Sequence, residues 1–371
     1  MNKLVGLAIA VLLSVSVLVG AQQRVVTVCD YEPPESHVTG LSVQGSFSWF
    51  DGPYSDNRNR VLAASMTADY GSLRSSESFA RQLDARAEIR GRTAGWTGDF
   101  EGAGSLTSFF DEGLFAVGAF GIDASISERL EVDLTAGIGN GRFRDVTPLA
   151  RAILIQNALL DLGELLAPVS NEVLLDLAQI LGEVGPTDEE RIVLLVERLL
   201  ETELVRGEEM DVRGLLEIDR ILEESGTSRL CGSDVQVRIG VSALLLPEPL
   251  VSSTGVVQAR YALVPDPVSQ VESSVEAKIR LAHFEQMNVT GSISYDRELP
   301  EGWTARAEYR LELDRMWTEM EATSWFHAVS SSLTTQILGS VGLSLVANAE
   351  YRTGDEEITF SLGMHLEADV F

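Results

Sequence analysis

The chain has 371 residues, and its 45% hydrophobic and 23% charged content is that of a folded protein. Its 56 acidic residues outnumber 28 basic ones, and the resulting net charge of −28 disfavours nucleic acid as a partner. Two cysteines are too few for a disulfide-rich scaffold or a four-cysteine zinc site.

Residues 1–21 have the pattern of a secretory signal peptide. Lys3 precedes the apolar run 4–19, and small residues follow it, so we expect cleavage after Ala21. A retained transmembrane helix is the alternative, but the run is marginal for spanning and no cluster of charges follows it. We expect residues 22–37 to form a periplasmic N-terminal segment.

Long runs of alternating residues occupy 38–145 and 231–371. In the run 79–92, for example, Phe79, Leu83 and Ile89 share one face, and charged residues fill the other. These runs suit the 9 to 11 residues of a tilted membrane-spanning strand better than the five or six of an ordinary strand. We predict about 14 strands (12 to 16), about six in the first segment and eight in the second. A soluble β-sandwich with polar outer faces is the alternative.

The period becomes helical between the two strand-rich segments, over residues 146–230. Leucine, isoleucine and valine recur at spacings of three and four, with breaks near Pro168, Gly185 and Gly207. Thr187 followed by Glu190 predicts a capping box at one helix start. We therefore expect an α-helical insert of three or four amphipathic helices, packed as a small acidic bundle.

The signal peptide, long amphipathic strands, short turns and terminal aromatic residue together resemble a Gram-negative outer-membrane β-barrel protein of the porin-like kind. The resemblance covers about residues 38–145 and 232–371 and indicates no narrower family. It implies an antiparallel transmembrane β-barrel in outer-membrane lipid. It also implies that Phe371 presents the C-terminal strand to the outer-membrane assembly machinery. Phe371 departs from the family pattern by sharing its face with polar residues such as Asp369.

The charged faces of three predicted strands are the candidate lining of a pore. Both signs of charge occur within single strands, so neighbouring strands could form ion-pair ladders across the interior. The residues could line an aqueous path and set its ion preference, or they could pair and close a narrow lumen. We favour the path, because about 14 strands enclose more space than side chains fill. The predicted pore-lining residues are Asp84, Arg86, Glu88, Arg90, Arg92, Glu276, Lys278, Arg280, Arg306, Glu308, Arg310 and Glu312.

Catalytic signals are weak. The four histidines show no metal-binding spacing, so we expect no metal and no cofactor. Ser324 with His327, or Ser361 with His365, could form a hydrolase pair. Both residue types are ordinary in a polar lumen, and we expect no catalytic residues.

Cys29 and Cys231 are predicted to form a disulfide. Six strands separate them, so both should lie on the periplasmic side, which is oxidising. Two free thiols are the alternative. The bridge would tie the N-terminal segment to the end of the insert.

These patterns predict an outer-membrane channel that passes small hydrophilic solutes or ions through a charged lumen. The helical insert would lie in the periplasm with both termini and brace the mouth of the channel. One alternative is a closed structural barrel that anchors the acidic insert for envelope attachment. Another is an outer-membrane lipid hydrolase. The sequence leaves the solute and the oligomeric state open.

Overall fold

A computed structural model describes residues 27–33, 35–50, 61–92, 95–110, 113–126, 129–183, 187–207, 209–223, 228–246, 249–281, 286–316, 323–338, 341–353 and 358–369. The predicted signal peptide and Phe371 lie outside these residues.

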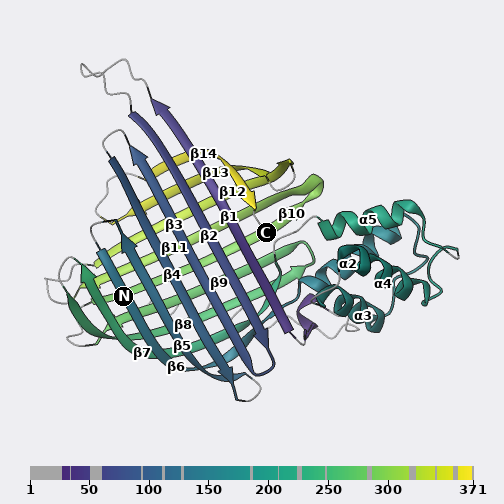
Figure 1. Cartoon of the computed structure of the whole chain (residues 1–371), viewed down its shortest axis with the longest axis horizontal. Coiled ribbons are helices and arrows are strands. Elements are labelled where there is room, and N and C mark those ends of the chain that lie inside the picture. Colours follow the sequence, from purple (N-terminus) through teal and green to yellow (C-terminus); the bar gives the residue numbers. More distant parts are fainter. Residues whose placement is uncertain are drawn as a thin grey trace.

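Within the described residues, fourteen antiparallel strands form one closed barrel (Figure 1). Each strand pairs with the next along the chain, and β1 pairs with β14. The predicted fold class, about 14 strands with a helical insert, is confirmed. The strands are β1 (Glu35–Phe50), β2 (Val61–Ser76), β3 (Phe79–Arg92), β4 (Gly95–Phe109), β5 (Leu114–Ser125), β6 (Arg129–Asp145), β7 (Leu230–Leu246), β8 (Leu250–Asp266), β9 (Ser269–Arg280), β10 (Gln286–Leu299), β11 (Trp303–Met316), β12 (Thr323–Leu338), β13 (Val341–Arg352) and β14 (Thr359–Asp369).

The alternation in the sequence separates the two faces of the barrel wall. On β7, Val237 and Ile239 are 56% and 63% exposed, whereas Asp234 and Gln236 are 5% and 6% exposed. The exposed apolar face is the outer surface, and the polar face lines the interior, where side chains from different parts of the wall cover one another. Figure 1 shows the purple and blue strands from the first part of the chain crossing in front of the green and yellow strands of the opposite wall.

Four α-helices between β6 and β7 form the insert beside one end of the barrel (Figure 1). They are α2 (Thr147–Asp161), α3 (Asn171–Gly182), α4 (Asp188–Leu200) and α5 (Val212–Glu223). The predicted capping box is present, because the Glu190 amide donates to Thr187 Oγ1 and the Thr187 amide donates to the Glu190 carboxylate. No helix among the described residues is long and apolar enough to cross a membrane.

The insert has its own apolar core, which the N-terminal segment completes. Fully buried leucines and isoleucines from the helices meet in this core, as do Val28 and Tyr31 from the segment before β1. Val28 belongs to a short 3-10 helix, η1 (Val28–Asp30). The Tyr31 hydroxyl donates to the carbonyl oxygen of Ala178 on α3, at 3.3 Å. The segment that precedes β1 and the helices that follow β6 therefore share one apolar core.

A disulfide joins the same two parts of the chain. Cys29 in η1 is bonded to Cys231 near the start of β7, with their Cα atoms 5.4 Å apart. These are the two residues for which the sequence favours a bridge. The two cysteines are 202 positions apart in the sequence. Their bond ties the N-terminal segment to the barrel wall beside the insert.

The two ends of the barrel differ in the length of their connections. We call the end that carries the N-terminal segment and the insert the helix end, and the opposite one the far end. Apart from the insert, the helix-end connections have two to four residues, namely 77–78, 110–113, 267–268, 300–302 and 339–340. Those at the far end have two to ten residues, namely 51–60, 93–94, 126–128, 247–249, 281–285, 317–322 and 353–358.

Candidate functional site: the barrel interior

The interior contains several hollows between the walls. One at the helix end has a volume of about 540 Å³, and residues from β1 through β11 line it. Asp84 on β3 and Arg306 on β11 face this same space from distant parts of the wall. A hollow lined by residues from so many strands lies inside the barrel. The polar face of the wall, which carries Asp84 and Arg306, therefore points inwards.

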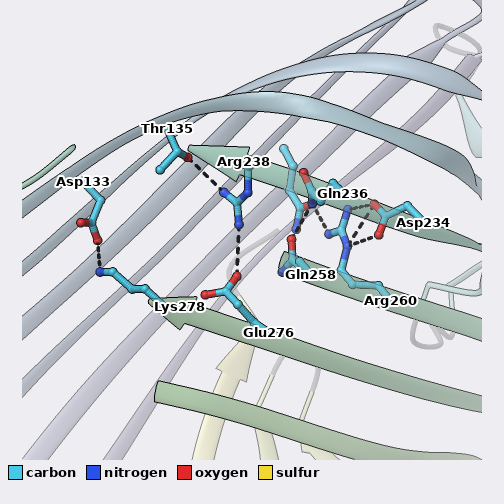
Figure 2. Close-up of polar contacts among 10 residues, drawn as sticks. Asp133, Thr135, Asp234, Gln236, Arg238, Gln258, Arg260, Glu276 and Lys278 are labelled. Atoms are coloured by element: carbon cyan, nitrogen blue, oxygen red, sulfur yellow. Dashed lines mark hydrogen bonds and ion pairs between the residues drawn. The ribbon is translucent and has the colours of Figure 1, made fainter. Parts of the chain in front are cut away.

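An ion-pair network crosses the inner face of β6 to β9 (Figure 2). Lys278 Nζ on β9 lies 2.6 Å from Asp133 Oδ2 and 3.4 Å from Glu131 Oε1, both on β6. This contact passes over the two intervening strands. Arg238 Nη2 on β7 donates to Glu276 Oε2 on β9, at 3.1 Å. The charges on this wall are thus largely compensated within it.

Arg260 on β8 extends the network to the opposite wall. Its Nε donates to Asp234 Oδ1 on β7, at 3.1 Å, and its Nη1 donates to Gln82 Oε1 on β3, at 2.7 Å. Its guanidinium carbon also lies 5.0 Å from the centre of the Phe143 ring. Three fixed partners hold this side chain across the interior, so it narrows the passage between β3 and β8.

Aromatic rings fill part of the interior at the helix end. Phe109 and Phe115 pack edge to face with ring centres 5.7 Å apart, and Phe115 is only 3% exposed. Arg142 lies 4.8 Å above the Phe109 ring, and its guanidinium donates to the carbonyl oxygen of Ser76. These rings and Arg142 therefore occupy interior space on the β4–β6 side of this end.

The inner face of β2 to β6 carries an excess of carboxylates, which we call the acidic basin. It encloses about 680 Å³ and contains one arginine, Arg86. Glu101 and Asp123 stand directly opposite each other on β4 and β5, although like charges in such positions repel. Lys278 from the other wall reaches one member of the basin. The carboxylates of the acidic basin are Asp69, Asp84, Glu101, Asp123 and Asp133.

The structure places the predicted β3 residues on the polar face of one strand. Asp84 and Arg86 border the acidic basin, and Arg86 Nε lies 3.7 Å from Asp69 Oδ1 on β2. Arg90 Nε donates to Glu88 Oε1 at 2.6 Å. Arg92 is the last residue of β3, and its side chain lies outside the described part of the structure.

The predicted residues on β9 and β11 form two separate groups. Glu276 and Lys278 join the network of β6 to β9, and Arg280 is the half-buried last residue of β9. On β11, Arg306 Nη2 lies 3.3 Å from Glu308 Oε2, and Arg310 Nη2 lies 3.9 Å from Glu312 Oε2. Within the described contacts, the β3 and β11 groups do not touch, although Asp84, Arg306 and Glu308 line one hollow.

One expectation about these residues needs correction. Ion pairs between neighbouring strands are present, because Arg86 Nε lies 3.7 Å from Asp69 Oδ1 on β2 and Arg306 Nε lies 3.7 Å from Asp296 Oδ1 on β10. Arg90, Arg306 and Arg310 also approach a carboxylate two residues along their own strand, which lies on the same face. The conceivable pair Ser324 and His327 is wrong, because residues three apart on a strand face opposite sides. His327 Nδ1 instead bonds Tyr309 Oη, at 2.8 Å.

The second conceivable pair, Ser361 and His365, shares one face of β14, but the side chain of His365 lies outside the described ones. Among the described residues, no three His, Cys, Asp or Glu side chains are placed to hold a metal ion.

Sequence reasoning missed several residues that shape the interior. Gln82, Asp234 and Arg260 make the contact between the walls, and Asp133 and Arg238 complete the network. Each of these residues occupies a polar position in an alternating run of the sequence. That alternation was the sequence feature from which their inward orientation could have been predicted.

The strand pairing, apolar outer face and polar interior define an antiparallel β-barrel of the transmembrane type. The resemblance to porin-like outer-membrane barrels is thereby confirmed at the level of the fold. The sequence matches no protein-family model and no curated protein.

Several solved structures resemble the chain, all at low identity. Pseudomonas aeruginosa OpdK, solved with vanillate, aligns over 90% of this chain and 98% of its own, with 7% identity and a TM-score of 0.33. Acinetobacter baumannii Omp33 aligns over 91% of this chain and 99% of its own, with 7% identity and a TM-score of 0.33. A KdgM porin aligns over 89% of this chain and 98% of its own, with 7% identity and a TM-score of 0.27. At such scores these likenesses carry no argument, and the assignment rests on the strand pairing of the chain itself.

Proposed function

We propose that the protein is an outer-membrane channel that passes small hydrophilic solutes or ions through its charged interior. In lipid every backbone polar group needs a partner, so a sheet that spans a membrane closes into a barrel with an apolar outer face. The fourteen-stranded barrel has this construction. Barrels of about eight strands are just filled by their side chains, and a wider one leaves room for water.

The acidic basin is the observation that carries the proposal. It leaves a volume of about 680 Å³ beside charged groups, which is space for hydrated ions or a small solute rather than a packed core. Arg260 and Gln82 bridge the walls beside it and would form the narrowest part of the path. The excess of carboxylates on β2 to β6 favours cations over anions.

The helix end is proposed to face the periplasm. Outer-membrane barrels have short periplasmic turns and longer outer loops, and the connections at the helix end are the shorter set when the insert is set aside. The disulfide at this end also suits an oxidising compartment. The insert would then brace the periplasmic mouth, with the N-terminal segment packed into its core.

Recording in planar lipid bilayers tests the function. The purified mature protein should produce stepwise ion currents, with a reversal potential in a salt gradient that indicates cation preference. A barrel that inserts without passing current would contradict the channel and would support a closed anchor for the acidic insert. Heat-modifiable migration on gels and a β-dominated circular dichroism spectrum would establish that the barrel was folded in the preparation.

A further inference from the structure

A further hollow lies between the two walls where Arg260 meets Gln82. It has a volume of about 280 Å³, and residues from β3 through β9 line it. It shares Asp84 and Asp133 with the acidic basin. It shares Gln82 and Arg260 with the hollow of about 540 Å³ at the helix end. A solute that moves between those two spaces past the contact of the walls therefore meets this hollow, which we call the neck hollow.

The charges around the neck hollow are balanced, unlike those of the acidic basin. Its lining carries three carboxylates and three cationic side chains, whereas the acidic basin carries five carboxylates and one arginine. A balanced space attracts neither a net cation nor a net anion strongly, but it can complement both ends of a solute that carries one charge of each sign. The charged residues of the neck hollow are Asp84, Asp133, Glu276, Arg238, Arg260 and Lys278.

Two of these charged side chains are held at one end and open at another (Figure 2). Lys278 Nζ lies 2.6 Å from Asp133 Oδ2, whereas Asp133 Oδ1 is buried and has no partner among the described residues. Arg238 donates through Nη1 to Thr135 and through Nη2 to Glu276, whereas its Nε is buried and likewise without a described partner. A buried polar group costs free energy unless it is hydrogen-bonded, so both atoms suit groups that a solute brings.

Gln236 offers an open acceptor beside the open donor of Arg238. Its Nε2 donates to Gln258 Oε1 at 2.5 Å, whereas its Oε1 is buried without a partner among the described residues. The residue is 6% exposed, so a bond to this oxygen would form away from water, where it is stronger. Gln236 and Arg238 are two residues apart on β7, so they share a face and lie about 7 Å apart along the strand.

We propose that the neck hollow binds small zwitterions that carry an ammonium group and a carboxylate, the class of the neutral α-amino acids. The carboxylate accepts from Arg238 Nε, and the ammonium group donates to Gln236 Oε1. Asp133 Oδ1 provides a further acceptor where the hollow borders the acidic basin. Because other bonds already hold these side chains, little ordering is needed when the solute binds. Resting on the proposed channel function, this site gives the path a preference for one class of solute.

Solutes that carry both charges, one charge or none test the site. L-alanine carries both, propionate lacks the amine, ethylammonium lacks the carboxylate, and glycerol lacks both. In planar bilayers, alanine should reduce the ion current with a half-maximal concentration about tenfold lower than propionate or ethylammonium, the effect of one more hydrogen bond to a charged group. If alanine acts no more strongly than glycerol, only water occupies the hollow and the site is wrong. If either single-charge solute equals alanine, the zwitterionic specificity is wrong.

Thermal unfolding of the full protein in detergent measures binding without a current. A solute that binds the folded state raises the unfolding temperature, so alanine should raise it more than glycerol at equal concentration. If alanine stabilises a barrel that passes no current, the channel is contradicted and the binding site stands. If current flows but alanine neither reduces it nor stabilises the barrel, the channel stands and the site is wrong.

Substitutions on β7 locate the two contacts. Arg238→Lys keeps the positive charge but removes the Nε donor, and Gln236→Leu removes the acceptor. Each should raise the half-maximal concentration of alanine about tenfold, because one hydrogen bond to a charged group is lost. Arg129→Lys is the matched control, since Arg129 lies on the adjacent strand and does not line the neck hollow. An unchanged response to alanine in both β7 variants, or an equal loss in the control, would contradict the site.

A change of specificity separates binding from a merely structural role. Gln236→Glu keeps an acceptor and adds a negative charge to the balanced lining. Ethylammonium should then reduce the current at least as effectively as alanine, whereas a residue that only supports the wall would weaken all responses alike. Migration on gels before and after boiling shows which variants fold. If Gln236→Glu retains the preference of the wild type for alanine, Gln236 does not contact the ammonium group and the proposed binding mode is wrong.

Discussion

Arg260 on β8 and Gln82 on β3 are joined across the barrel interior, with Nη1 2.7 Å from Oε1, although four strands separate β3 from β8 along the wall. The same arginine is paired with Asp234, which is 5% exposed. Removing Arg260 would leave a buried carboxylate without its partner, which is a large structural penalty. Gln82 is therefore the better position at which to open the contact.

Gln82→Ala should widen the path while leaving the ion pair of Arg260 intact. We expect single-channel conductance to rise on the order of 1.5-fold, because a side chain is withdrawn from the narrowest part. Gln258→Ala is the matched control, since Gln258 bonds Gln236 on the adjacent strand and not the opposite wall. Equal conductance in both variants and the wild type would show that the contact does not limit flow.

Glu101→Gln with Asp123→Asn should reduce cation preference and slightly stabilise the barrel. The two carboxylates are opposed in the register, so neutralising them removes a repulsion worth roughly 0.2–1 kcal/mol. It also removes two negative charges from the acidic basin. Reversal potentials in a potassium chloride gradient should move towards zero, and thermal unfolding should shift upwards. Glu183→Gln, on the exposed end of α3, should change neither quantity.

The barrel was predictable from the sequence because one physical rule acts on every strand. A strand with lipid on one side and polar contacts on the other alternates apolar and polar residues. The long alternating runs of β3, β11 and β14 therefore indicate strands. The helical insert was equally clear, because its period changed at Pro148, which is near the start of α2. These features depend on residues close together in the chain.

The shape of the interior was not predictable in the same way. The contact between Arg260 and Gln82 depends on how near the two walls come, and alternation says nothing about that distance. Phe115 follows Leu114, so both faces of β5 begin with large apolar residues and the period does not reveal the inward one. The short seam between β1 and β14, where four residue pairs close the barrel, likewise depends on strand direction in three dimensions.

Removing the disulfide should loosen the N-terminal segment from the insert. Bridges of this kind typically contribute about 2–4 kcal/mol by restricting the unfolded chain. Cys29→Ala with Cys231→Ala should lower the midpoint of helix unfolding, followed by circular dichroism at 222 nm. The wild type with reductant should behave alike, whereas reductant should not affect the double variant. A midpoint unchanged by either treatment would show that the core around Val28 and Tyr31 suffices.

Tyr31 should make the insert sensitive to alkali. Burial, with a smaller contribution from Asp145, raises the pKa of Tyr31 to about 12, against about 10 in the unfolded chain. Below pH 10 the phenol is neutral in both states, so its contribution is constant. Between pH 10 and 12 the unfolded state loses its proton first, and stability should fall by about 2 kcal/mol.

Tyr31→Phe separates this effect from general alkaline damage. The variant lacks the hydrogen bond to Ala178, so it should be less stable by about 1 kcal/mol at neutral pH. Its stability should nevertheless decline less steeply from pH 10 to 12 in helix-unfolding measurements. Parallel pH profiles for the variant and the wild type would contradict the assignment to Tyr31.

The last prediction concerns the side of the membrane on which the insert lies. Both the N-terminal segment and the insert occupy the helix end, and the shorter connections there favour the periplasm. A cysteine introduced as Glu183→Cys, at the exposed end of α3, should therefore resist a membrane-impermeant thiol reagent in intact cells. It should react once the outer membrane is opened. Ile126→Cys, at an exposed position in the turn between β5 and β6 at the far end, is the control and should react in intact cells. Labelling at position 183 and not at 126 would place the acidic insert on the cell surface, where it would serve attachment rather than brace a periplasmic mouth.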